Sequence, residues 1–180
     1  MSIDETLKEA VDKGRLQRLE LEFPSDAHKR TILLHPKLLS DINDADVKFV
    51  SRFERLRADL EMFVKGQIIS MSVTPYGHKT AYMGLLDPMS DGIWEIRSRD
   101  PSPALRVFGK FPCKDVFVGL NWEPRSVGWG DKKALGDGMS LEFQFAMIEA
   151  NKLWDQSLPG TKPITSGNIY DCVSEKVFLV

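Results

Sequence analysis

The sequence contains few of the residues that cross-link a protein, bind metal or anchor it in a membrane. Its two cysteines, Cys113 and Cys172, lie 59 positions apart with no CxxC motif or Cys/His cluster nearby, so we expect free thiols and no metal site. No run approaches the roughly 20 apolar residues of a membrane span. Residues 1–17 alternate in charge and lack the apolar stretch of a secretory signal. These absences predict a cytoplasmic protein that does not enter a membrane.

Motifs that bind common cofactors are also missing. The sequence has no P-loop, no dinucleotide fingerprint, no nucleophile elbow and no metal-ligand spacing. We therefore expect no cofactor. A small-molecule enzyme remains an open alternative, but these absences weaken it.

The residues that are present fit one globular domain over 1–180, since 42% are hydrophobic and 28% charged. The net charge of −2 hides an asymmetry along the chain. Residues 93–133 carry 8 Lys/Arg against 5 Asp/Glu, whereas residues 134–180 carry 3 against 6. The basic segment can guide a phosphate-bearing partner to one face, while the acidic remainder argues against strong, sequence-independent nucleic-acid binding.

Periodicity predicts four helices and several strands. The clearest helix is 44–65, capped by Asn43 or Asp44, whose apolar stripe includes Val50, Phe53, Leu60 and Phe63. We expect this stripe to pack on a sheet. The other expected helices are 3–13, 36–42 and 140–156, and the expected strands are 16–23, 67–73, 92–99, 104–111, 114–122 and 175–180.

Three of these strands follow one another closely. Only the segment DPSP and the pair Pro112-Cys113 separate 92–99, 104–111 and 114–122. Connections this short predict consecutive antiparallel hairpins. The fold class is therefore α+β, an antiparallel meander packed against the long helix and a C-terminal helix.

The amino-acid sequences of these strands resemble those of the RelE/HigB (RelE/ParE) superfamily, in its phage-derived, HigB-like branch. That branch has Gly-Leu-Trp-Glu-Leu-Arg in one strand and Tyr-Arg-Val-Phe-Tyr in the next. The matching residues of this chain are Gly-Ile-Trp-Glu-Ile-Arg at 92–97 and Leu-Arg-Val-Phe at 105–108, followed by Val-Phe-Val-Gly-Leu at 116–120. The resemblance covers about 44–155 and leaves the N- and C-terminal extensions unexplained.

The resemblance implies a toxin of a toxin-antitoxin system, with a cognate antitoxin as partner. Most such toxins are ribosome-dependent mRNA endonucleases, and the ParE branch poisons gyrase. It further implies RNA or the ribosome as a partner of this chain. Fold alone does not determine activity, so the function depends on the individual residues of the site.

Cleavage of RNA requires cations for the phosphate and groups that move protons. Alternate residues of a strand share a face, so Arg97 and Arg99 point the same way as Glu95. If the hairpin register places Arg97 or Arg99 beside Arg106, the solvent-facing side of the sheet presents a guanidinium pair suited to phosphate. By position, Arg97 and Arg106 match basic strand residues of the RNase toxins. We expect Glu95 to be an internal partner of an arginine.

The remaining candidate residues lie around this pair. His78, in the expected loop at 74–80, completes a candidate catalytic set with Arg97 and Arg106 as the proton-transfer group, provided that this loop folds over the sheet. Trp129 lies between glycines in a long loop, where an aromatic ring can stack on a base. The candidate nucleic-acid-binding residues are Arg99, Lys110, Arg125, Trp129, Lys132 and Lys133.

One departure from the toxin pattern bears on function. RNase toxins tend to carry a Tyr or His in or near the final helix, whereas 140–156 has Phe143, Phe145 and Trp154. Two functions therefore stay open. One is a toxin-like RNA-binding protein with mRNA endonuclease activity, and the other is a non-catalytic phage or mobile-element protein of the same fold that binds a protein partner.

Overall fold

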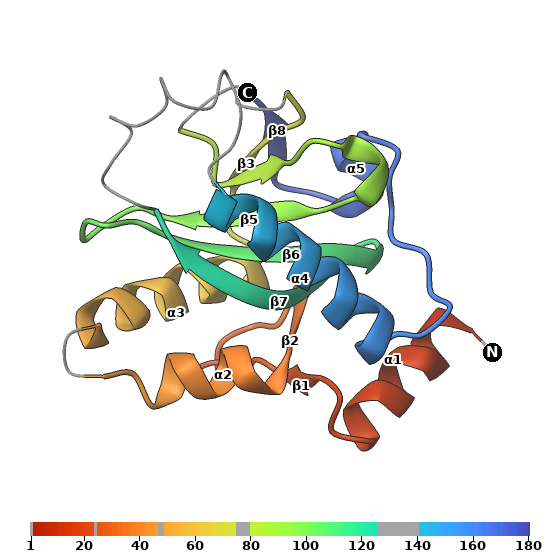
Figure 1. Cartoon of the computed structure of the whole chain (residues 1–180), viewed down its shortest axis with the longest axis horizontal. Helices are drawn as coiled ribbons and strands as arrows, with labels where there is room; N and C mark the ends of the chain where they lie inside the picture. The colour runs from red at the N-terminus through yellow and green to blue at the C-terminus, as the bar shows by residue number, and fades with distance from the viewer. Residues whose placement is uncertain (1, 24, 47–48, 75–79, 126–140) are drawn as a thin grey trace.

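In a computed structural model of the chain, residues 2–23, 25–46, 49–74, 80–125 and 141–180 are described (Figure 1). Within these ranges eight strands form one sheet in the order β1-β2-β7-β6-β5-β4-β3-β8. The strands are β1 Gln17–Arg18, β2 Thr31–Leu34, β3 Ile69–Ser72, β4 Met83–Leu85, β5 Trp94–Ser98, β6 Leu105–Cys113, β7 Val116–Pro124 and β8 Val177–Leu179. The helices are α1 Ile3–Asp12, α2 Pro36–Asn43, α3 Val50–Val64, α4 Leu141–Ser157 and α5 Ile169–Cys172, with a 3-10 turn at Met89–Asp91.

The predicted meander is confirmed, because β5, β6 and β7 pair antiparallel in succession. The sheet around it is larger than expected and mixed. On one side β2 pairs parallel with β7, and on the other β3 pairs parallel with both β4 and β8. The fold is therefore α+β as predicted, but the sheet is not antiparallel throughout, and residues before 44 and after 155 supply three of its strands.

Helices cover both faces of the sheet (Figure 1). On one face, α2, α3 and α5 enclose a core that contains Phe53, Trp94 and Phe111. On the other face, α1 and α4 enclose a second core that contains Phe108, Val118 and Trp154. The strand β2 serves both cores, since Ile32 and Leu34 belong to the first and Leu33 to the second.

The predicted helix 44–65 begins later, at Val50, with Phe49 at the N-cap. The expected caps have other roles. Asn43 is the last residue of α2 and accepts a hydrogen bond from Arg57, and Asp44 is the C-cap of α2. The stripe prediction is confirmed for Phe53, Leu60 and Phe63, which are all buried, and wrong for Val50, which is 38% exposed at the first turn.

The predicted strand 16–23 is shorter than expected, because only Gln17–Arg18 belongs to β1. The following residues turn away from the sheet toward α3. There the backbone N–H of Glu22 donates to the carboxylate of Glu61 at 3.0 Å. A side chain on a distant helix thus takes up a backbone donor that a longer strand would have used in the sheet.

The other predicted elements are found close to their expected limits. A capping box between Ser2 and Glu5 starts α1, and Pro36 is at the first turn of α2. The last strand, β8, lies within the expected 175–180. Across the described ranges, no helix combines the length and the apolar composition that crossing a bilayer requires.

Candidate functional site

The register of β5 and β6 places Arg97 directly opposite Arg106. The sequence predicted that either Arg97 or Arg99 would lie beside Arg106. The observed register follows from the hairpin that the short DPSP connection closes. Beside Arg97, the neighbouring strand β4 contributes Gly84, whose missing side chain leaves room for the guanidinium. A Cβ atom at Gly84 would overlap Arg97 Nη2.

The two arginines share one buried carboxylate. Arg97 Nε donates to Glu95 Oε1 at 2.7 Å, and Arg106 Nη1 forms an ion pair with Glu95 Oε2 at 2.8 Å. The Glu95 side chain is 2% exposed, and those of Arg97 and Arg106 are 13% and 18% exposed. The prediction that Glu95 is an internal partner of an arginine is therefore confirmed. The pair does not lie open on the sheet surface as predicted, since both side chains are largely buried and both guanidinium groups pair with Glu95.

Arg106 has further neighbours on the same face. Its guanidinium carbon lies 5.2 Å from the ring centroid of Phe143, at the start of α4. Burial lowers the pKa of Arg106, and the positive charges of Arg97 and Arg125 lower it further, whereas Glu95 raises it. Two other predicted basic residues, Arg97 and Arg125, thus lie close enough to Arg106 to influence its pKa.

Glu123 brings a second carboxylate to this face. It lies on β7 directly opposite Arg106. Burial raises its pKa, and the nearby carboxylate of Glu142 raises it further. The face therefore combines three arginines with two buried or half-buried carboxylates, which reduces its attraction for a phosphate.

Arg99 and Lys110 have other hydrogen-bond partners. Arg99 is exposed at the end of β5 and donates to the carbonyl of Ala81 at 2.9 Å. Burial and the charge of Arg97 lower its pKa. Lys110 is only 5% exposed beneath α4, where Nζ donates to Asn151 at 2.6 Å and lies over the Trp154 ring. A lysine in this position is held inside the protein and not presented to a nucleic acid.

Four predicted site residues, His78, Trp129, Lys132 and Lys133, lie outside the described residues. Most of the long loop expected around Trp129 also lies outside them. In the part of the chain that is described, no three His, Cys, Asp or Glu side chains form a cluster suited to a metal ion.

Sequence reasoning missed an exposed apolar stripe on α4. Leu141, Phe145 and Ile148 are 51%, 66% and 62% exposed. Their spacing of four and three places them on one side of the helix. The opposite side, with Ala146, Met147, Ala150 and Trp154, is buried. The signal was present in the sequence, because the run from Leu141 to Ile148 has more apolar residues than one buried face needs.

Comparisons of this chain with models of known protein families, with curated proteins and with solved structures found no match.

Proposed function

We propose that the chain has a RelE/HigB-like core without ribonuclease activity, and that it binds a protein partner through the exposed stripe of α4. Support for the core comes from the order of elements, in which α3 precedes the meander β5–β7 and α4 follows it. The strands of this meander contain the residues that carry the resemblance, at 92–97, 105–108 and 116–120. The stripe Leu141, Phe145 and Ile148 is the observation that carries the binding function.

Ribonuclease chemistry has little support on the described face. A phosphate site needs guanidinium groups available to the ligand, and Glu95 already engages both Arg97 and Arg106. Proton transfer needs a titratable group near the phosphate, and the sequence of α4 contains neither Tyr nor His. The non-catalytic alternative is therefore the better supported of the two.

The charges around the stripe indicate what kind of partner fits. Glu142, Glu149 and Asp155 are distributed along α4, against the single cation Lys152. An exposed apolar helix face commonly marks a protein interface, and complementary charges at its rim select the partner. The partner is then an amphipathic segment of another protein with apolar residues at its centre and basic residues at its edges.

Fluorescence anisotropy with two synthetic helical peptides tests this proposal. Both carry the same leucine stripe, one flanked by lysines and the other by glutamates. We expect the lysine-flanked peptide to bind more tightly, and Phe145→Glu or Ile148→Glu to weaken its binding at least about tenfold. Phe178→Glu is the matched control, since Phe178 is 47% exposed on the edge strand β8. Equal binding of both peptides, or equal loss in the control, would contradict the proposal.

A second candidate function is RNA binding with mRNA endonuclease activity, opposed by a cognate antitoxin. The proximity of Arg97, Arg106 and Arg125 is the observation that favours it. Inducible expression in bacteria with growth monitoring separates the two candidates. A translation-dependent endonuclease arrests growth. A partner-binding protein leaves growth unchanged.

A further inference from the structure

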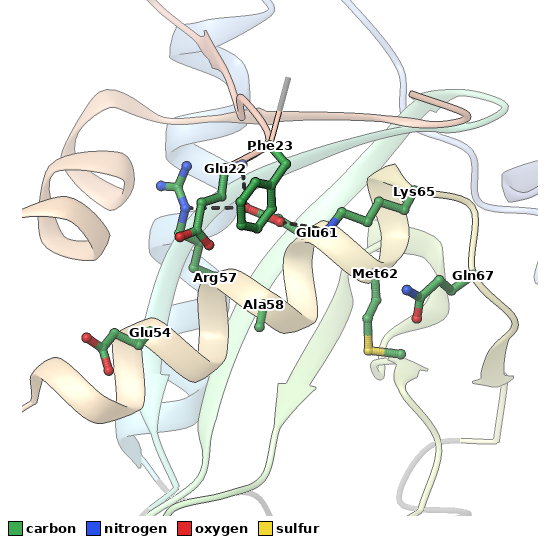
Figure 2. A pocket seen from close by; sticks show the side chains of 9 residues that line it. All are labelled: Glu22, Phe23, Glu54, Arg57, Ala58, Glu61, Met62, Lys65 and Gln67. Carbon is green, nitrogen blue, oxygen red and sulfur yellow. Dashed lines mark hydrogen bonds and ion pairs between the residues drawn. The ribbon is translucent and has the colours of Figure 1, made fainter. Parts of the chain in front are cut away.

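A hollow of about 320 Å³ lies between α3 and the segment that contains Glu22 and Phe23 (Figure 2). Its buried carboxylate is that of Glu61, which pairs with Arg57 at 3.4 Å and with Lys65 at 3.2 Å. The same carboxylate accepts the hydrogen bond from the backbone N–H of Glu22. The buried charge of this hollow is thus satisfied within the protein and needs no ligand. Main-chain groups without a partner lie elsewhere, at one edge of the sheet.

That edge is the strand β8, which pairs only with β3 (Figure 1). The backbone N–H of Val180 donates to the carbonyl of Met71 on β3 at 3.0 Å. Successive residues of a strand direct their N–H and C=O groups to opposite sides, so those of Val177 and Leu179 point away from β3. Within the described ranges, no hydrogen bond reaches the N–H or C=O groups of these two residues.

The side chains along this edge are apolar and exposed. Phe178 is 47% exposed, Leu179 is 57% exposed, and Ile68, directly before β3, is 66% exposed. Edge strands are commonly protected from further pairing by a charged side chain, a proline or a bulge. The strand Val177–Leu179 contains neither a proline nor a charged residue. It is therefore open to pairing with a further strand.

The opposite edge of the sheet has a different character. There β1 has only two residues, Gln17 and Arg18, and both are polar and exposed. A head-to-tail contact between β8 of one copy and β1 of the next would place Phe178 against these polar side chains. The strand β8 is therefore better matched to β8 of a second copy than to β1.

We propose that two copies of this chain associate by antiparallel pairing of their β8 strands, which makes the two sheets continuous. Because Val177 and Leu179 have the free main-chain groups, Val177 of each copy forms two hydrogen bonds with Leu179 of the other. The two-fold axis then passes beside Phe178, and the two Phe178 side chains meet at a pair without hydrogen bonds, where cross-strand side chains are closest. Lys176 lies opposite Val180 of the other copy, so like charges are not opposed. Such an interface is isologous, the commonest arrangement in homodimers.

This inference does not rest on the proposed partner-binding function. The helix α4 packs on β6 and β7, whereas β5, β4 and β3 lie between these strands and β8. Phe145→Glu is expected to weaken peptide binding and to keep the dimer, and Phe178→Glu is expected to do the reverse. Failure of one proposal therefore leaves the other unaffected.

Sedimentation velocity at protein concentrations up to about 1 mM tests the dimer. Phe178→Glu places two carboxylates opposite each other at the two-fold axis, and Phe178→Lys places two ammonium groups there. Like charges in directly opposed positions destabilise a sheet, so each variant alone is expected to weaken the dimer at least about tenfold. An equimolar mixture of the two variants is expected to associate again, because a carboxylate then faces an ammonium group.

Two variants of Leu179 test the main-chain hydrogen bonds. Leu179→Ala and Leu179→Pro both remove most of the side chain, but only the proline removes the outward N–H. Proline is tolerated on an edge strand where the N–H points away from the sheet. We expect Leu179→Pro to weaken the dimer at least about tenfold more than Leu179→Ala does. Circular dichroism confirms that each variant is folded, and the mixture of Phe178 variants decides alone if Leu179→Pro is not.

Phe145→Glu on α4 is the control and leaves the dimer unchanged. A wild-type protein that stays monomeric at every concentration overturns the proposal. So does a mixture of the two Phe178 variants that stays monomeric, an equal effect of the two Leu179 variants, or a dimer lost with Phe145→Glu.

Discussion

Arg97 on β5 and Arg106 on β6 are directly opposed in the sheet, and a single buried carboxylate, that of Glu95, pairs with both. Like charges in directly opposed positions destabilise a sheet. The carboxylate offsets this repulsion and leaves the cluster of three side chains with one net positive charge. The cluster therefore contributes to the stability of the hairpin as well as to the charge of the surface.

The double variant Arg97→Ala with Arg106→Ala is expected to lower the free energy of unfolding by about 3–5 kcal/mol, because it leaves Glu95 as an uncompensated buried charge. A change of two ordinary surface residues would cost no more than about 0.5 kcal/mol each. Urea denaturation measures the difference. Adding Glu95→Gln to the double variant is expected to recover much of the loss, and Lys162→Ala, at an exposed position, serves as the control. A double variant as stable as the wild type would show that Glu95 does not depend on the two arginines.

Phe53→Ala is expected to cost about 3–5 kcal/mol, because it removes a buried ring from the core under α3. Phe53 is 3% exposed, and its ring packs edge-on against Trp122 with centroids 4.9 Å apart. Val50→Ala, one turn earlier and 38% exposed, is the matched control and is expected to cost less than about 1 kcal/mol. Equal losses in the two variants, measured by urea denaturation, would contradict the assignment of the buried face.

Local patterns predicted most elements of this fold, because they depend on neighbouring residues. The helix periodicity around Phe53 and the short connection between β5 and β6 are examples, and both predictions are confirmed. The parallel pairing of β2 with β7 was not predicted. Its partners, such as Ile32 and Phe117, are far apart in the sequence. A strand buried on both faces also lacks the alternation that identifies a half-exposed strand.

The sequence predicted which residues of the candidate site lie beside one another, but not how deeply they are buried. Alternation along β5 correctly placed Glu95 and Arg97 on one face, and the hairpin placed Arg106 beside them. Nothing in the strands themselves indicated that α4 would cover this face and bring Phe143 over Arg106. The packing of a helix from a distant part of the chain decided whether these arginines face solvent.

Cys172 is expected to resist alkylation in the native protein. Burial raises the pKa of its thiol to about 12, from 9.0, so very little thiolate is present at neutral pH. Since the folded-state pKa lies above the unfolded value, the thiol favours the folded state fully below pH 9, and this contribution is lost as the pH rises towards 12. Iodoacetamide labelling followed by mass spectrometry should modify the half-buried Cys113 first and Cys172 only in denaturant. Rapid labelling of Cys172 under native conditions would contradict this prediction.

The contribution of Lys110 to stability is expected to depend on pH in the opposite direction from that of Cys172. Burial lowers the pKa of its ammonium group from 10.5, an effect only partly offset by Asp91 and Asp155. Between the lowered pKa and 10.5 the unfolded chain binds the proton that the folded chain has released, so stability rises with pH across this interval. Replacing Lys110 with Met removes the titrating group and keeps most of the side-chain volume.

The measurement for Lys110 is the free energy of unfolding of the wild type minus that of Lys110→Met, followed from neutral pH towards 10.5. We expect this difference to become more favourable to the wild type as the pH rises. Lys110→Met also removes the hydrogen bond from Lys110 to Asn151, which changes the difference in free energy of unfolding at neutral pH. It does not reverse the dependence of this difference on pH, because the amide of Asn151 does not titrate. A difference that stays flat or falls would mean that the Lys110 ammonium is solvated in the folded protein, and α4 would then not cover this part of the sheet.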